Sequence, residues 1–182
     1  MARSRSHGGR QDSVRREGFL ILVVTGSAGY PYDRLLRKVD VIAPEFDFPF
    51  VMQTGVFPFA AANCKTFGMV GYDHFMKLFR EATLIISHTS SGPLIYAHRF
   101  EKPIITVPRR KAFGEALADH QVETADALKA VDEPMRMVLD DEENMESAIR
   151  TMLEASAAGL RYTTGKQELE SLQSAIRKAC GI

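Results

Sequence analysis

The segment from Thr83 to Pro93 constrains the fold of this 182-residue chain more than any other. An apolar strand from Thr83 to Ile86 stops at small and hydroxylated residues, and a helix is expected to begin near Pro93. In such a strand–turn–helix unit, free N–H groups and the positive end of the helix dipole converge on the turn. The segment therefore predicts an α/β unit whose turn can bind an anion such as phosphate.

The same alternation recurs along the chain. Residues 19–25 form a continuous apolar run, which is typical of a parallel strand covered on both faces. Strands are expected at 19–25, 50–53, 66–70, 83–87, 104–107 and 136–139, with helices at 31–43, 73–82 (Asp73 as N-cap), 93–100, 115–131 and in two segments built on Met145–Leu153 and Leu169–Ile176. This order predicts the α/β class: a Rossmann-like, open and mostly parallel sheet with helices on both faces.

In such a sheet the carboxyl ends of the strands meet at the edge where ligands bind. The turns 26–29, 54–55, 87–92 and 108–110 are all expected at this edge. Any residue of these turns that can donate a hydrogen bond is therefore a candidate for ligand binding.

Composition excludes several classes of protein. The net charge is zero, which argues against a general nucleic-acid binder. The two cysteines, Cys64 and Cys180, argue against a disulfide scaffold and a zinc site. Residues 1–18 are expected to form a disordered basic leader, with a weak electrostatic tether to anionic lipid as the alternative. Residues 19–182 would then form one domain with C-terminal helices.

The turns themselves offer two interpretations each. The 26–29 turn has neither the P-loop pattern nor GxGxxG, so it is either a tight connection or one side of a site. Residues 87–92 can donate hydrogen bonds to a diphosphate, or Ser90 or Ser91 can cap a helix that has Pro93 at its first position. His88 ends a strand at the ligand edge, where a functional and a structural role are equally expected.

Polar residues also follow the strand at 104–107. One of Arg109 and Arg110 is expected to face a phosphate, because guanidinium groups pair well with phosphate oxygens. Residues 119–121 (Asp-His-Gln) can bind sugar hydroxyls, or form a polar helix face. The chain lacks Asp-x-Asp, a common carboxylate pair for a metal–diphosphate complex, and this favours a site without a metal.

Two blocks of sequence resemble a known family. FMKLFREATLIISH (residues 75–88) and EKPIITVPRRKAFGEALADHQVETADAL (residues 101–128) resemble the C-terminal half of family 28 glycosyltransferases of the GT-B fold, which binds the sugar donor. The resemblance is greatest to the small subunits of bipartite UDP-sugar transferases of exopolysaccharide and capsule synthesis, which are related to the catalytic subunit of the dolichol-linked chitobiose GlcNAc-transferase.

The resemblance implies a single GT-B half-domain that acts as the donor-binding, catalytic subunit of an inverting UDP-sugar transferase. A membrane-anchored partner would bind the polyprenyl-linked acceptor, and the complex would lie at the cytoplasmic face of the plasma membrane. No cofactor and no metal are implied. The implied catalytic residues are His88 and His120, and the implied substrate-binding residues are Gly26, Ser27, Gln53, Gly55, Ser90, Ser91, Gly92, Tyr96, Arg109, Asp119 and Gln121, with Gln53, Gly55 and the 69–72 loop near the uracil.

The chain departs from the family pattern at several positions. Ser90 replaces a glycine of the turn, Tyr96 stands where relatives often carry a ribose-binding Glu, Glu101 replaces another glycine, and Ala116 and Leu117 stand where histidine is common. Ser90, Pro93 and Tyr96 leave open a second interpretation, a non-catalytic subunit that stabilises a membrane transferase.

Overall fold

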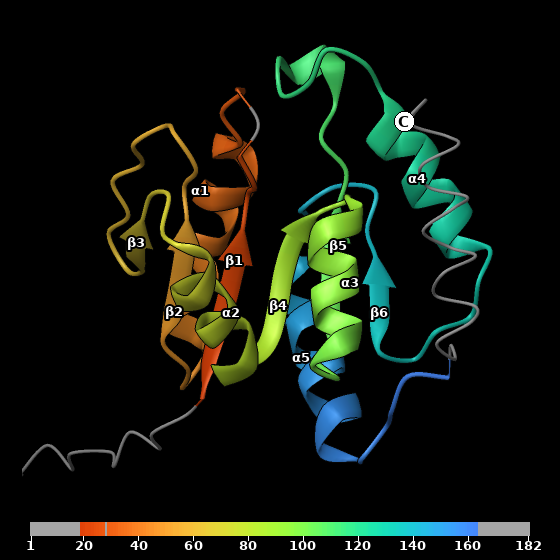
Figure 1. Ribbon diagram of the computed structural model, residues 1–182. Helices are drawn as coiled ribbons and strands as arrows, with labels where there is room; N and C mark the ends of the chain where they lie inside the picture. The colour runs from red at the N-terminus through yellow and green to blue at the C-terminus, as the bar shows by residue number, and fades with distance from the viewer. Residues whose placement is uncertain (1–18, 28, 164–182) are drawn as a thin grey trace, which may run out of the picture.

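The computed structural model describes residues 19–163 apart from Ala28. These residues form a six-stranded sheet in which every neighbouring pair of strands is parallel. The strand order is β3-β2-β1-β4-β5-β6, with bounds β1 (Leu20–Val24), β2 (Phe50–Gln53), β3 (Lys65–Phe67), β4 (Ala82–His88), β5 (Ile104–Val107) and β6 (Arg136–Val138). The predicted Rossmann-like sheet is confirmed (Figure 1).

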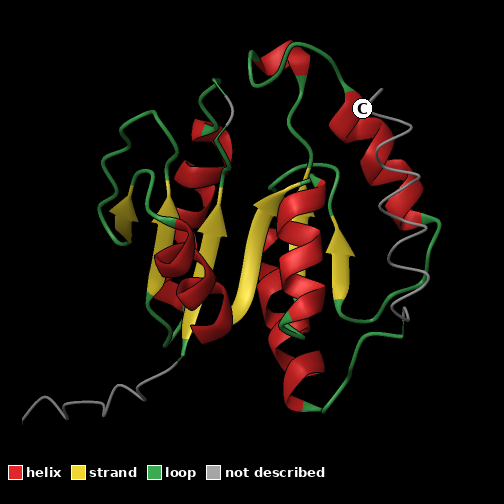
Figure 2. Ribbon diagram, viewed as in Figure 1, coloured by secondary structure: helices red, strands yellow, loops and turns green. Residues whose placement is uncertain are grey.

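Helices cover both faces of the sheet, as predicted (Figures 1 and 2). One face packs against α1 (Asp33–Ile42) and α5 (Met145–Ala157). The other face packs against α2 (Tyr72–Glu81), α3 (Ser91–Arg99) and α4 (His120–Lys129). Two short 3₁₀ turns, Ala43–Glu45 and Lys111–Phe113, complete the described elements.

The central strands are buried because both of their faces are covered. In β1, Ile21 and Val23 belong to the core under α1 and α5, whereas Leu22 and Val24 belong to the core under α2, α3 and α4. Successive side chains of a strand point to opposite faces, so a strand between two helical layers must be apolar at every position. This is the physical reason for the continuous apolar run at 19–25.

Four helix starts differ from their predicted positions, and the first of them, α1, begins at Asp33 rather than at residue 31. Gly71, rather than Asp73, occupies the N-cap position of α2. Helix α3 begins at Ser91, two residues before Pro93. Helix α4 begins at His120 rather than near 115, because Gly114 has a φ of 69° and the buried carboxylate of Glu115 binds Arg34 instead.

The basic leader and the helix expected at Leu169–Ile176 lie outside the described residues. None of the helices within 19–163 combines the length and the apolar character needed to cross a bilayer.

The strand order reverses direction between β1 and β4. Helices leave this pair of strands toward opposite sides, and the carboxyl edge between such strands is where open α/β sheets hold ligands. Gly26 and Ser27 follow β1 at this point, and Ser90 follows β4. The fold therefore brings the predicted turns 26–29 and 87–92 together.

Candidate functional site

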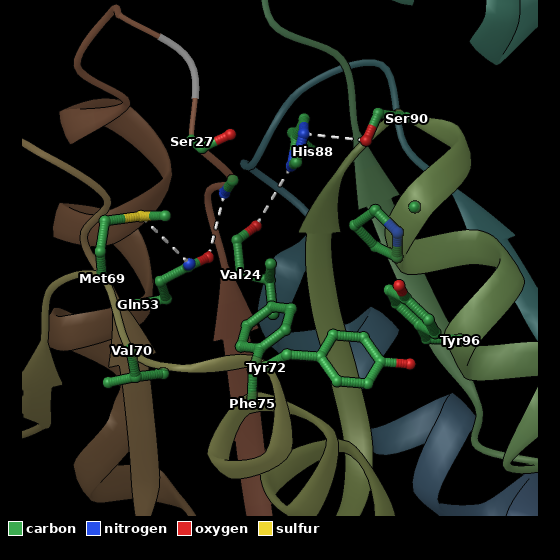
Figure 3. Close-up of a pocket in the computed structure, with 13 residues that line it drawn as sticks. Val24, Ser27, Gln53, Met69, Val70, Tyr72, Phe75, His88, Ser90 and Tyr96 are labelled. Atoms are coloured by element: carbon green, nitrogen blue, oxygen red, sulfur yellow. Dashed lines mark hydrogen bonds between the residues drawn. The ribbon is translucent and has the colours of Figure 1, made fainter.

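A cavity of about 410 Å³ opens at the carboxyl ends of β1 and β4 (Figure 3). Its lining comes from β1, β2, β4, the two helices that follow β3 and β4, and the loops between them. The lining residues are Val24, Gly26, Ser27, Gln53, Met69, Val70, Tyr72, Phe75, His88, Ser90, Gly92, Pro93 and Tyr96.

The side chain of Gln53 connects the turn after β1 to the loop before α2. Its Oε1 accepts a hydrogen bond from the Gly26 backbone N–H at 3.1 Å, and its Nε2 lies 4.0 Å from the Met69 sulfur. The Thr25 hydroxyl donates to the Gln53 carbonyl at 2.8 Å. These contacts hold the two loops on either side of the cavity at a set spacing.

Two glycines allow the backbone turns to approach each other. Gly26 has a φ of 79°, and a Cβ there would lie 2.8 Å from the Cε1 atom of His88. Gly55 has a φ of 70°, and a Cβ there would lie 2.8 Å from the Gly26 carbonyl oxygen. A positive φ and this crowding both require glycine. Gly55 does not line the cavity, so its role is to support the Gly26 turn.

His88 and Ser90 form a hydrogen-bonded pair at the end of β4 (Figure 3). The Ser90 hydroxyl lies 2.9 Å from Nε2 of His88, and Nδ1 of His88 lies 3.4 Å from the Val24 carbonyl oxygen. The imidazole is 7% exposed. Burial, together with the positive charge of Arg109, lowers the pKa of His88 to about 4. The ring is therefore uncharged at neutral pH.

The N-terminus of α3 opens toward the same cavity. Ser90 occupies the N-cap position, but its side chain makes no capping hydrogen bond. Of the two interpretations of this turn, capping by the Ser90 or Ser91 side chain is not observed, and the Ser90 hydroxyl is bound to His88 instead. The first N–H groups of a helix and its dipole favour an anion, and in α3 no side chain caps them.

The opposite wall of the cavity is apolar and aromatic. Met69, Val70 and Tyr72 come from the loop and first turn at α2, the segment expected near a base. Tyr96 of α3 packs edge-on against Phe79, with 5.5 Å between ring centroids. Figure 3 shows Val70, Tyr72, Phe75 and Tyr96 below Ser27 and Ser90 in this view. The site thus has one polar side and one side suited to a planar ring.

The lining contains no aspartate, glutamate, lysine or arginine. Within residues 19–163, Ala28 excluded, no group of three His, Cys, Asp or Glu side chains could hold a metal ion. Backbone N–H groups, hydroxyls and the dipole of α3 are therefore the groups of the lining that can meet negative charge.

Arg109 was expected to face a phosphate, but the structure places it in the protein interior. Its guanidinium is 2% exposed and donates to the backbone carbonyls of Thr25, Tyr30, Pro31 and Glu115 at 2.7–3.1 Å. It also lies over the Tyr32 ring, 4.5 Å from the centroid. Arg109 does not line the cavity, and these carbonyls accept hydrogen bonds from its two terminal nitrogens.

The segment 119–121 also lies outside the cavity lining. Asp119 accepts a hydrogen bond from the Lys111 N–H, and Gln121 accepts one from the Arg109 N–H. The His120 side chain is half exposed, with Nδ1 lying 3.6 Å from a Glu123 carboxylate oxygen. Two of the three side chains therefore hold the loop after β5 in shape. Ser91, the first residue of α3, does not line the cavity either.

The fold brings seven of the implied site residues to one cavity, namely Gly26, Ser27, Gln53, His88, Ser90, Gly92 and Tyr96. Sequence reasoning missed Val24, Phe75 and Pro93. Phe75 packs partly against the core, with its ring centroid 5.1 Å from that of Phe79, and it also lines the cavity. Helical periodicity alone does not separate a face that packs from one that lines a cavity.

Comparison with known families gives one match. Over residues 20–178 the sequence matches the family described as the glycosyltransferase family 28 C-terminal domain. No curated protein matches the sequence.

Solved structures share the fold at low sequence identity. The glycotransferase of kitacinnamycin has a TM-score of 0.57 and 16% identity over 98% of this chain. The calicheamicin glycosyltransferase CalG4 has a TM-score of 0.58 and 15% identity over 94% of this chain. The spinosyn forosaminyltransferase SpnP has a TM-score of 0.52 and 16% identity over 88% of this chain. The match covers 44%, 42% and 40% of those chains, so this chain spans less than half the length of each.

Proposed function

Because the chain belongs to the family of glycosyltransferase family 28 C-terminal domains, we propose that its cavity binds the nucleoside diphosphate part of a UDP-sugar. The observation that carries the proposal is the open N-terminus of α3. It faces the Gly26–Ser27 turn across the cavity, at the switch point of the sheet. Two sets of N–H groups can then hold the two phosphates of a diphosphate.

The uracil would lie against the aromatic side of the cavity. Tyr72, Phe75 and Tyr96 offer ring surfaces there, and Gln53 offers an amide N–H beside Met69. A planar base gains from contact with aromatic rings and from one or two polar groups that set its orientation. The 69–72 loop and Gln53 therefore remain our candidates for base recognition.

The reaction proposed for the site is glycosyl transfer with inversion. The bond between the anomeric carbon and the β-phosphate oxygen breaks, an acceptor hydroxyl oxygen attacks from the opposite face, and its proton passes to a base. Negative charge grows on the leaving UDP, so N–H groups preorganised around the diphosphate lower the barrier. His120, Asp119 and Gln121 follow β5 at the same edge and remain our candidates for the transferred sugar.

We further propose that a second, membrane-anchored subunit supplies the polyprenyl-linked acceptor in exopolysaccharide or capsule synthesis, on the cytoplasmic side of the membrane. The support is the resemblance of residues 101–128 to that group. Phe113 and Leu117 in the loop after β5 are 59% and 77% exposed, and they offer an apolar surface at the edge where an acceptor must arrive.

Calorimetric titration of the purified chain with UDP, in EDTA and with GDP and ADP as controls, tests the proposal. We expect UDP to bind more tightly than either control. A chain that binds none of the three, alone and with its partner subunit, would contradict donor binding. Transfer of sugar from a UDP-sugar panel to a polyprenyl-linked acceptor is expected only with the partner present.

A non-catalytic subunit that stabilises a membrane transferase is the second candidate function. The absence of charged side chains from the cavity lining, and Tyr96 in place of a carboxylate, favour it. Substituting Tyr96→Glu separates the two functions. A catalytic subunit should change its activity or its donor preference, whereas a scaffold should leave the activity of the complex unchanged.

A further inference from the structure

We propose that His88 is a positioning residue that keeps the N-terminus of α3 open by binding the Ser90 hydroxyl that would otherwise cap this helix. The inference concerns the fold without ligand, and only the part of its test that uses UDP rests on the proposed function.

Ser90 is well placed to cap α3. Serine is among the preferred N-cap residues, and its hydroxyl usually accepts a hydrogen bond from the N–H of the second or third helical residue. In α3 these residues are Gly92 and Pro93, and proline has no N–H. The Gly92 N–H is therefore the one that Ser90 could cap, yet no such bond is made.

The imidazole of His88 binds this hydroxyl instead. A backbone carbonyl can only accept, so the contact between Nδ1 and the Val24 oxygen places the ring proton on Nδ1. Nε2 then carries a lone pair and accepts the Ser90 hydroxyl proton at 2.9 Å. The low pKa of His88 supports this neutral form.

The ring itself has little freedom to move. It is 7% exposed, and Gly26 lies so close that an added Cβ would be 2.8 Å from Cε1. The Ser87 hydroxyl, 3.3 Å from Nδ1, donates to the same Val24 carbonyl. With the ring held from both sides, the Ser90 hydroxyl is the group that adjusts, and it turns away from the helix.

The consequence is that the N–H group of Gly92, a residue that lines the cavity, has no side-chain cap and is free for a ligand. Without an acceptor at position 88, the Ser90 hydroxyl can rotate back and cap the helix. That change would stabilise α3 while weakening its hold on an anion, since the N–H would then have an internal partner.

The test compares His88→Leu with the double variant H88L/S90A, and uses His74→Leu, an exposed histidine on α2, as the control for loss of a histidine. In the ligand-free protein, amide hydrogen exchange at Gly92 should slow in H88L relative to the wild type. It should return toward the wild-type rate in H88L/S90A. In calorimetric titration, H88L should bind UDP about tenfold more weakly than the wild type. The additional removal of the Ser90 hydroxyl in H88L/S90A should recover affinity by at least about threefold.

Two results would overturn the proposal. One is unchanged exchange at Gly92 in H88L. The other is a double variant that binds UDP no better than H88L, as a purely structural role for His88 would give. Should H88L fold poorly, long-range ¹H–¹⁵N spectra of the wild type decide the question, because the proposal requires the Nδ1–H tautomer. A wild type that does not bind UDP would contradict the proposed function, while the exchange and tautomer measurements would still decide this inference.

Discussion

At the scale of single residues, the geometry of the cavity depends on Gly26 and His88, which touch each other across the ends of β1 and β4. Gly26 has a backbone conformation that a side chain disfavours, and it leaves no room for a Cβ beside the imidazole. His88 is a buried, uncharged imidazole whose two nitrogens have separate partners. Changes at either residue should act on the site through this contact.

Gly26→Ala is expected to lower the affinity for UDP by more than about tenfold. The new Cβ would meet the His88 ring at 2.8 Å in a left-handed backbone, so the turn or the ring must move. The measurement is calorimetric titration, with Gly29→Ala as the matched control, because a Cβ at Gly29 meets nothing within 4 Å. Equal losses of affinity in the two variants would contradict this account of Gly26.

The buried His88 should make the protein less stable at acid pH. Burial lowers the pKa of His88 to about 4, from 6.5 for a free histidine, so between these values the unfolded chain binds the proton more readily. The contribution of the neutral ring is fully present above pH 6.5 and is lost as pH falls toward 4. The free energy of unfolding of the wild type, relative to H88L, should fall by about 3 kcal/mol between pH 7 and pH 4. Urea unfolding at several pH values measures it, and a constant difference would contradict the assignment.

At the scale of elements, α3 is open at one end and closed at the other. Its C-terminus has the two hydrogen bonds of a Schellman motif, from the Glu101 N–H to the His98 carbonyl at 3.1 Å and from the Lys102 N–H to the Ala97 carbonyl at 2.8 Å. Glu101 has a φ of 52°, where glycine is favoured. The family's usual glycine at this position thus has a conformational reason.

Glu101→Gly should therefore stabilise the protein by about 1 kcal/mol, since a non-glycine residue in the left-handed region carries a steric cost of that size. Glu101→Ala is the control, because alanine has the same Cβ and should give no such gain. Thermal or urea unfolding gives the difference between the two variants. If glycine and alanine gave equal stability, backbone strain at Glu101 would not be its cause.

At the scale of the whole molecule, Arg109 joins two loops that follow different strands. Its guanidinium binds carbonyls of the loop between β1 and α1 and of the segment after β5. Beside it, Arg34 of α1 makes an ion pair with Glu115 and a second one with Glu142. These contacts connect the loop after β1 and helix α1 to the segments that follow β5 and β6 at the carboxyl edge of the sheet.

Replacing Arg109 should lower stability rather than act on the ligand directly. Arg109→Leu leaves several buried carbonyls without a partner, and about 3 kcal/mol of unfolding free energy should be lost. Arg109→Lys should recover only part of it, because one ammonium group does not span the same four oxygens. Urea unfolding is the measurement. A variant of unchanged stability that no longer binds UDP would instead support the direct phosphate contact implied by the family resemblance.

Much of the fold could be predicted from local patterns. Continuous apolar runs, such as residues 19–25, predicted buried parallel strands, because a strand covered on both faces must be apolar throughout. Small residues after each run predicted turns at one edge, and the confirmed parallel sheet places the turns after β1, β2, β4 and β5 there. Helix starts were less accurate, as at α4, where the partner of Glu115 lies 81 residues away in the sequence.

By itself, the sequence determined the α/β class, the parallel sheet and the edge at which the cavity lies, because these follow from residue types that are close together along the chain. Only the tertiary structure decided which side chains at that edge face the cavity. Thr25 and Arg109 are 84 residues apart in the sequence. The hydrogen bond between them helps to hold the Arg109 side chain in the interior, although a contact with a phosphate was expected. The orientation of the Ser90 hydroxyl likewise depends on the His88 ring, and the carbonyl of Val24, in another strand, orients that ring. Hydrogen bonds between segments distant in sequence leave no local pattern, so the folded chain alone reveals them.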